Sequence, residues 1–237
     1  MDGLRVAEVR QVNRLIALGQ ISKRIVEIRL PHPVCVAIDG RDGAGKTFLA
    51  DELVPILGSM GREVIRASID GFHNPRALRY VRGRSSPEGY FRDSFNYEAF
   101  KNMLLLPLRP GGSRKYRTSV FDYRTDSAVG SQPKQATDDS IVIVDGIFLL
   151  RPELIRYWDF TVFVDVTLEV SIARCALRDP LSSADPTAES NQRYVKGQAL
   201  YFTECTPRSL ADIVFNNDDF LNPSIHANQK SQRSIDE

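Results

Sequence analysis

The segment VAIDGRDGAGKTFLADEL (residues 36–53) changes from an apolar run to a glycine-rich turn and then to helical spacing. The apolar run is typical of a buried strand. The turn fits the pattern G-x-x-x-x-G-K-[ST], in which backbone N–H groups converge on phosphate oxygens and the helix N-terminus adds partial positive charge. In this pattern the lysine reaches the β- and γ-phosphates, and the threonine hydroxyl ligates Mg²⁺. We therefore predict a site for ATP and Mg²⁺ formed by Gly40, Arg41, Asp42, Gly43, Ala44, Gly45, Lys46 and Thr47.

Apolar runs elsewhere in the chain predict the rest of the fold. We expect strands at 34–38, 63–69, the start of 141–150, 160–166 and 211–217, and a helix over 46–61. Helical patterns separate most of these strands, and such alternation favours a parallel, doubly wound sheet with helices on both faces. The sequence thus predicts the α/β class, with the three α/β/α layers of a P-loop protein.

The domain limits follow from changes in pattern along the chain. Residues 1–30 have mostly helical spacing and predict one or two amphipathic helices before Pro31 and Pro33. The P-loop domain is expected over 31–220. Two stretches, about 71–98 and 107–139, are longer than ordinary connections, so we interpret them as functional insertions. The polar residues 221–237 are expected to form a flexible tail.

Bulk composition excludes several classes of protein. The chain has 237 residues, 31 Lys and Arg against 30 Asp and Glu, and a net charge of +1, which gives no global case for nucleic acid or an anionic membrane. Its three cysteines lie far apart and suggest a reducing compartment without a zinc site. We see no signal peptide and no apolar run as long as a membrane span. These features predict a cytoplasmic protein, and they are compatible with a homo-oligomer.

Two aspartates follow predicted strands next to the glycine-rich turn. Asp145 closes the apolar run IVIVD, as in a Walker B pattern, and we assign it with Thr47 to the metal. Asp70 closes VIRASID, and the carboxyl ends of such strands share one crevice. One acid would hold the metal while Asp70 takes a proton from an attacking hydroxyl. No guanine-reading N-K-x-D is present, so the pair favours a kinase over a GTPase.

The segment RCALRDP (174–180) places two arginines four residues apart on one helix face. Arg174 and Arg178 would close over the triphosphate and neutralise charge on the transferring phosphoryl group. We therefore predict a helical lid over about 174–195, and count both arginines with Asp70 and Lys46 as catalytic.

In their order along the chain these motifs resemble the uridine kinase branch of the P-loop kinases, which includes phosphoribulokinase and bacterial pantothenate kinase. The likeness extends over about 33–217 and includes SIDGFH, SFNYEAF, VFDYRTD and YVKGQALYFTECTPRSLADIVF. It implies phosphoryl transfer from ATP, with Asp70 in the place of the catalytic base. It also implies an acceptor site, to which we assign Phe72, His73, Arg84, Asn96, Tyr116, Phe121 and Tyr123.

The chain departs from the branch where the acceptor is recognised. Asn96 stands in place of an aspartate that contacts ribose, Phe121 in place of a tyrosine, and Cys175 in place of a lid arginine. The leading hypothesis is an ATP-dependent kinase for the 5′-hydroxyl of a nucleoside such as uridine or cytidine. A kinase for a sugar or pantothenate and a nucleotide-binding regulator without transfer activity are the alternatives.

One basic stretch allows two interpretations. It combines tyrosines and phenylalanines with Arg76, Arg79, Arg82, Arg84 and Arg92. Such a mixture can bind single-stranded nucleic acid. Because the chain has no wider basic excess, we prefer an acceptor-side lip that folds over an anionic or hydroxylated substrate. The expected partners are therefore ATP and a small hydroxylated acceptor.

Overall fold

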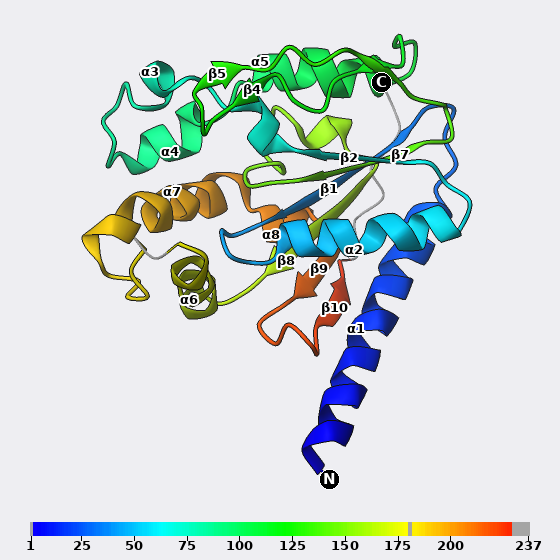
Figure 1. Ribbon diagram of the computed structural model, residues 1–237, viewed down its shortest axis with the longest axis horizontal. Coiled ribbons are helices and arrows are strands. Elements are labelled where there is room, and N and C mark those ends of the chain that lie inside the picture. The colour runs from blue at the N-terminus through cyan, green and yellow to red at the C-terminus, as the bar shows by residue number, and fades with distance from the viewer. Residues whose placement is uncertain (1, 180–181, 229–237) are drawn as a thin grey trace.

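The computed structural model describes residues 2–179 and 182–228, with side chains from Val12 onward. A six-stranded sheet forms its centre in the order β10-β9-β8-β1-β7-β2 (Figure 1). Its strands are β1 (Val34–Gly40), β2 (Val64–Ser68), β7 (Ile141–Asp145), β8 (Phe160–Asp165), β9 (Ile213–Asn216) and β10 (Ser224–Ala227). All pairings are parallel except β9 with β10. The predicted α/β fold and its five strands are confirmed.

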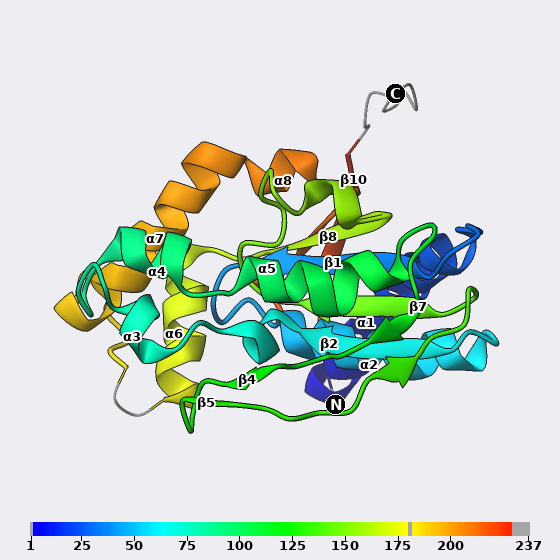
Figure 2. The same cartoon turned by 90° about the horizontal axis from the view of Figure 1, so that it is seen from above.

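Helices cover both faces of this sheet (Figure 2). One apolar cluster joins the sheet to α1 (Asp2–Val26) and α2 (Lys46–Ser59). A second cluster, on the other face, includes residues of α4 (Pro87–Asp93), α5 (Tyr97–Phe100) and α7 (Glu189–Cys205). The central strands are buried on both faces, which is why they read as continuous apolar runs.

The pairing of β1, β7 and β2 aligns the C-terminal ends of these three strands at one edge of the sheet. Asp145 at the end of β7 pairs with Ile38 of β1 and with Ser68 of β2. The glycine-rich turn therefore leaves β1 at the same edge where β2 runs into the short helix η1 (Ile69–Phe72). At this edge of the sheet the structure places the groups that the sequence predicted to meet.

The two insertions fold into small elements. The first contains η1, α3 (Arg76–Arg79), α4 and α5, and it continues through η2 (Lys101–Leu105) and η3 (Leu106–Leu108). The second forms two short antiparallel pairs, β3 (Lys115–Tyr116) with β6 (Lys134–Gln135) and β4 (Phe121–Asp122) with β5 (Ser127–Ala128). The remaining elements are η4 (Ile155–Tyr157), α6 (Leu168–Arg178) and α8 (Pro207–Leu210).

Of the two expectations for the ends of the chain, one holds and one is wrong in part. The N-terminal pattern forms one continuous helix, α1, whose buried Leu18, Ile21 and Ile25 belong to the cluster shared with α2. The tail predicted for 221–237 is wrong over its first part, because Ser224–Ala227 form the edge strand β10. The strand was missed because only Ile225 is partly buried there, which leaves no apolar alternation to detect. Residues 229–237 lie outside the described part.

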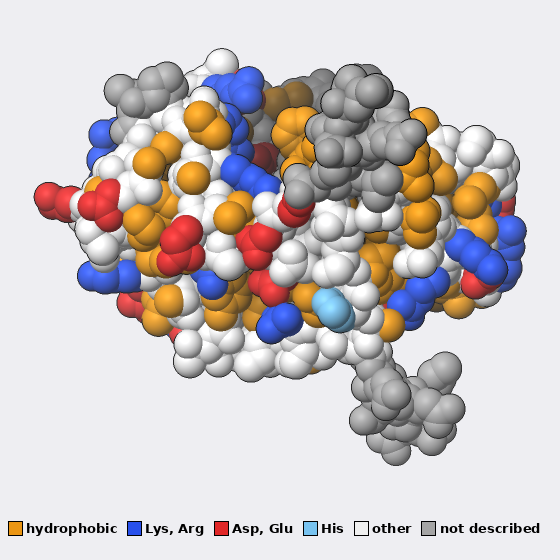
Figure 3. Space-filling model, turned by 90° about the horizontal axis from the view of Figure 1, so that it is seen from below, with side chains coloured by type: hydrophobic (Ala, Val, Ile, Leu, Met, Phe, Trp, Pro, Cys, Tyr) orange, Lys and Arg blue, Asp and Glu red, His pale blue; other side chains and the backbone are white. Residues whose placement is uncertain are grey.

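The surface carries both signs of charge. Figure 3 shows basic and acidic side chains interspersed over the face seen from below, as a net charge of +1 would suggest. Among residues 2–179 and 182–228, no helix has the length and apolar character needed to cross a membrane.

Candidate active site

The glycine-rich turn, residues 40–47, has the backbone of a phosphate-binding loop. Gly43 and Gly45 adopt left-handed φ values of 69° and 93°, which favour glycine. The turn ends where α2 begins at Lys46, so the N–H groups of the first helical turn face the loop. The Lys46 ammonium donates a hydrogen bond to the carbonyl of Arg41 at 2.6 Å, which keeps its charge at the loop. The loop thus presents an anion site of backbone donors and one lysine.

Neighbouring helices hold this loop in place through Asp42. The Tyr90 hydroxyl donates to Asp42 Oδ2 at 2.5 Å, and Gln198 Nε2 donates to the same oxygen at 3.0 Å. Ser171 of α6 donates to the Asp42 carbonyl at 2.6 Å. Burial, together with the negative charge of Asp42, raises the pKa of Tyr90 well above its usual value, so this hydroxyl remains a donor. The loop conformation therefore depends on α4, α6 and α7.

Asp145 meets Thr47 as the Walker pattern predicts. The Thr47 hydroxyl donates to Asp145 Oδ2 at 2.6 Å, and Arg66 forms an ion pair with Asp145 Oδ1 at 2.8 Å. One hydroxyl and one buried carboxylate supply oxygen ligands of the kind that Mg²⁺ takes, with waters and phosphates completing its shell. Within the described residues no cluster of three or more acidic, His or Cys side chains could enclose a metal. The residues present therefore fit a magnesium ion that arrives with the nucleotide.

Asp70 lies in η1, directly after β2, and 58% of its side chain is exposed to solvent. Desolvation raises the pKa of its carboxyl above the ordinary value. The charges of Asp145 and Asp42 act in the same direction, whereas His73 and Lys46 oppose them. The end of β2 pairs with Asp145 of β7, so Asp70 lies at the same edge of the sheet as the P-loop and the proposed metal ligand. A carboxylate in this position can accept a proton from a hydroxyl held next to it.

The two lid arginines lie on the far side of the P-loop from β2. Arg174 donates to the carbonyls of Asn217 at 2.8 Å and Asp218 at 3.0 Å, which fastens α6 to the end of β9. Arg178 lies one turn further along α6. Both arginines, together with Phe48, Leu177 and Phe220, line a cavity of about 610 Å³ that opens onto Gly43, Gly45, Lys46 and Thr47.

Three separate cavities, each sharing lining residues with the next, lie from this nucleotide pocket to Asp70, and we refer to this row of cavities as the groove. Arg178 lines both the P-loop cavity and a middle cavity of about 330 Å³ between α6 and α7. Tyr90, Tyr123 and Tyr194 line the middle cavity and also a third cavity of about 370 Å³ beside Asp70. We call this third cavity the acceptor pocket. A donor bound at the P-loop and an acceptor beside Asp70 would face each other along this groove.

The predicted acceptor residues divide into two groups. His73 and Tyr123 line the acceptor pocket, and their rings stack with centroids 4.7 Å apart. The other members lie elsewhere: Phe72 is buried against Phe100, and Asn96 caps α5 by accepting a hydrogen bond from Ala99. Tyr116 is buried in β3, Phe121 lies half-buried in β4, and Arg84 stacks on Tyr80.

The acceptor pocket also contains residues that the sequence did not assign to it. Tyr90, Arg193 and Tyr194 reach it from α4 and α7, and Arg76 and Arg79 reach it from α3. The arginines of α3 belong to the basic stretch that suggested an acceptor-side lip. The α7 residues had no local signal, because only the fold brings that helix against α4.

Asp39 is a further residue whose structural role the sequence did not indicate. Its buried carboxylate accepts hydrogen bonds from the backbone N–H of Gly40 at 2.7 Å, Leu149 at 3.1 Å and Leu150 at 3.0 Å, and from the Tyr201 hydroxyl. Burial raises its pKa, although the hydrogen bonds from Tyr201, Leu150 and Gly40 act in the opposite direction. Asp39 therefore ties the start of the P-loop to α7 and to the segment after β7.

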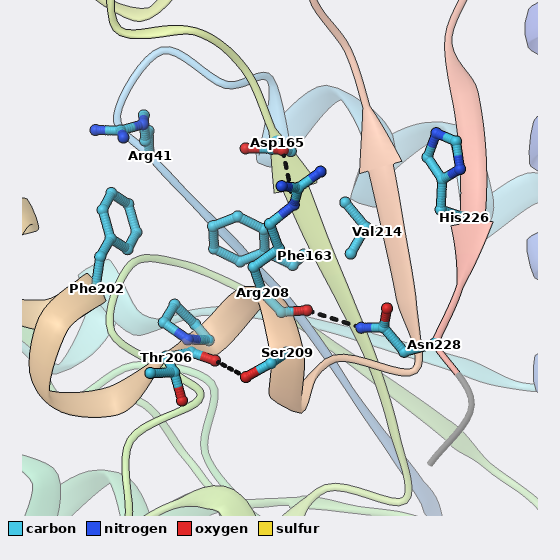
Figure 4. A pocket seen from close by; sticks show the side chains of 11 residues that line it. Arg41, Phe163, Asp165, Phe202, Thr206, Arg208, Ser209, Val214, His226 and Asn228 are labelled. Carbon is cyan, nitrogen blue, oxygen red and sulfur yellow. Dashed lines mark hydrogen bonds and ion pairs between the residues drawn. The ribbon is translucent and has the colours of Figure 1, made fainter.

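The side chain of Arg41, predicted to bind ATP, lies outside the P-loop cavity. The guanidinium lies 4.3 Å from the Phe202 ring centroid, in a separate cavity of about 690 Å³ against β8, β9 and β10 (Figure 4). In the same cavity Arg208 pairs with Asp165 at 3.1 Å. Only the backbone of Arg41 therefore belongs to the P-loop site, through its bond from Lys46.

Comparisons with known proteins identify the family of this chain. The model of the "Phosphoribulokinase / Uridine kinase family" matches residues 35–196. Uridine kinase of Brevibacillus brevis is 27% identical over 194 residues, which cover 77% of this chain and 84% of that protein. Uridine kinase of Saccharomyces cerevisiae is 26% identical over 190 residues, and this match spans only 36% of the yeast protein.

A solved structure gives the same fold. The structure of a possible uridine kinase from Bacillus stearothermophilus superposes with a TM-score of 0.66 at 24% identity, covering 83% of this chain and 96% of that chain. At this identity the likeness concerns the fold alone.

Proposed function

Because the chain belongs to the phosphoribulokinase/uridine kinase family, we propose that it transfers the γ-phosphoryl group of ATP to a hydroxyl group of a small acceptor. The observation that supports this most strongly is the groove that runs from the P-loop to the acceptor pocket beside Asp70. A protein that only binds a nucleotide needs no second pocket and no carboxylate that lines it.

We assign the reaction to four groups of side chains. Lys46 and the P-loop N–H groups hold the β- and γ-phosphates, and Thr47 and Asp145 would hold Mg²⁺. When bound there, the ion would supply positive charge that stabilises the charge developing on the phosphates. Asp70 accepts the hydroxyl proton while the acceptor oxygen bonds to the γ-phosphorus and the bond from phosphorus to the ADP oxygen breaks. Arg174 and Arg178 neutralise charge on the group in transit.

Which compound accepts the phosphoryl group is a separate question from the type of reaction. The names of the curated relatives suggest a nucleoside, such as uridine or cytidine. A sugar and pantothenate are the alternatives, because Asn96 and Phe121 replace polar groups of the uridine kinase branch. A hydrogen-bonding site discriminates strongly only where its polar partners are present.

A panel of acceptors tests the proposed reaction. ADP release from Mg·ATP should rise severalfold over the acceptor-free rate with at least one nucleoside, sugar, sugar phosphate, hydroxy acid or pantothenate. The phosphorylated product would be identified by mass spectrometry. ADP release that no acceptor stimulates would instead support a regulator that binds nucleotide without transferring phosphate.

Arg178→Ala should lower kcat by about 10- to 100-fold with little change in the KM for the acceptor. The reason is that negative charge on the phosphoryl group grows only as it detaches, and Arg178 lies between the P-loop and the middle cavity. Steady-state kinetics at saturating Mg·ATP measures the effect. The matched control is Arg29→Ala, which removes an exposed arginine paired with Asp139. A change confined to acceptor KM would make Arg178 a substrate-binding residue.

A further inference from the structure

The acceptor pocket has an unequal charge balance. Four arginines line it, Arg76, Arg79, Arg124 and Arg193, whereas Asp70 is the one carboxylate among its described lining residues. A pocket for an uncharged alcohol needs a base and hydrogen-bond partners, and it gains nothing from four guanidinium groups. The arrangement raises the question of what these charges bind.

Arg79 is the most deeply placed of the four. It is only 8% exposed, and its Nη2 reaches Asp126 Oδ1 at a long 3.4 Å. Its buried Nε has no hydrogen-bond partner among the residues that the structure describes. Asp126 also accepts the backbone N–H of Arg76 at 2.9 Å, so this carboxylate is shared. A buried guanidinium with one weak contact is costly unless another anion completes its partners.

Arg193 approaches the same pocket from α7. Its Nη1 donates to the Arg84 carbonyl at 2.5 Å, and its guanidinium lies 4.9 Å from the centroid of Tyr80 and 5.6 Å from that of Tyr90. Its Nε is also buried without a hydrogen-bond partner. Aromatic rings and a carbonyl orient the side chain but do not neutralise its charge.

Two solvent-facing arginines of the same insertion are paired with carboxylates at short distances. Arg82 lies 2.9 Å from Asp93, and Arg92 lies 2.7 Å from Glu204 and 3.0 Å from Glu88. Arg79 at the pocket has only the long contact with Asp126. This contrast indicates that the pocket arginines have an external partner.

We propose that the acceptor alcohol carries a fixed negative charge, a carboxylate or a phosphate, which Arg79 and Arg193 bind while the hydroxyl faces Asp70. This inference rests on the proposed kinase function. The planar guanidinium fork pairs well with either anion. A volume of about 370 Å³ holds roughly a dozen water-sized groups, which suits a sugar phosphate or a hydroxy acid. The acceptor class differs from the uncharged nucleosides on which uridine kinases act.

Matched acceptor pairs test this inference in the full-length protein. Ribose with ribose 5-phosphate, and glycerol with glycerate and glycerol 3-phosphate, differ only in the charged group. We expect kcat/KM for a charged member to exceed that of its neutral partner by about 100-fold or more. Comparison of the phosphate-bearing acceptors with the carboxylate-bearing acceptor shows which anion is preferred.

Substitutions of Arg79 and Arg193 then test whether these side chains bind the anion. Arg79→Met and Arg193→Met should each raise the KM for the charged acceptor by about 10- to 100-fold and leave the KM for ATP unchanged, because each removes a hydrogen bond to a charged group. Arg79→Lys should recover part of the loss. Arg82→Met is the matched control from the same insertion, and thermal unfolding checks that each variant is folded.

Binding of inorganic phosphate provides a measurement that does not depend on turnover. Calorimetric titration in the presence of a non-hydrolysable ATP analogue should detect binding to the wild type that Arg79→Met weakens. Equal binding by both proteins, or a neutral nucleoside used better than every charged acceptor, would overturn the inference while leaving the kinase function intact. ADP release that no acceptor stimulates would contradict the kinase function, whereas the phosphate titration still decides the anion site.

Discussion

Asp70→Asn should lower phosphoryl transfer by roughly two to four orders of magnitude while ATP affinity stays within a few-fold of the wild type. The substitution keeps the shape of the side chain and removes the proton acceptor beside the acceptor pocket. Thr47, Asp145 and the P-loop are untouched, because Asp70 forms no hydrogen bond with them. Turnover and direct nucleotide binding should be measured on the same preparation.

Asp138→Asn is the control for this substitution, since Asp138 is exposed and pairs only with Arg114 at the surface. Undiminished transfer in Asp70→Asn would show that the carboxylate is not the base. Loss of ATP binding would instead make Asp70 a metal-binding or structural residue.

The raised pKa of Asp70 predicts that kcat falls at low pH. Desolvation raises the pKa of Asp70, so its carboxylate is lost by protonation at a higher pH than that of an ordinary aspartate. As the pH falls through this raised pKa, the base disappears and kcat should fall with it. A pH profile of kcat should show this acidic limb in the wild type, and the residual activity of Asp70→Asn should lack it.

Lys46→Ala should reduce kcat by about 100-fold or more. Its ammonium lies at the P-loop, 2.6 Å from the Arg41 carbonyl. There it can stabilise negative charge on the γ-phosphate during transfer. ATP affinity should fall as well, because the same charge attracts the bound triphosphate. Steady-state kinetics and nucleotide titration measure the two effects separately.

Lys23→Ala is the control for the lysine, because this exposed side chain on α1 pairs only with Glu27. Lys46→Arg should not restore activity, since the larger guanidinium cannot occupy the narrow place between loop and phosphate. Near wild-type turnover of Lys46→Ala would show that the P-loop takes no part in phosphoryl transfer.

The parts of the site that could be predicted from sequence are those encoded locally. The strand, glycine-rich turn and helix around Lys46 follow one another in the chain, and parallel strands bring Thr47 to Asp145 as expected. The roles proposed for Arg174 and Asp70 also follow from their position after predicted strands.

The parts that could not be predicted depend on packing between distant segments. Arg79 and Arg193 meet at one pocket only because α3 packs against α4 and α4 packs against α7, and neither residue stands in a motif with the other. Asn96 was expected at the acceptor because of its place in SFNYEAF, but such a residue also serves as a helix cap, and here it caps α5. β10 is too polar and too short for its pattern to reveal a strand.

The central position of β1 affects how the protein is synthesised. β1 ends at Gly40, whereas its two partners begin at Ile141 and Phe160. While the ribosome adds the residues between, the apolar strand has both edges unpaired, and such edges promote aggregation. Pairing over so long a stretch of chain also makes folding slow. The central strand that leads into the P-loop can therefore be completed only after β7 and β8 have emerged from the ribosome.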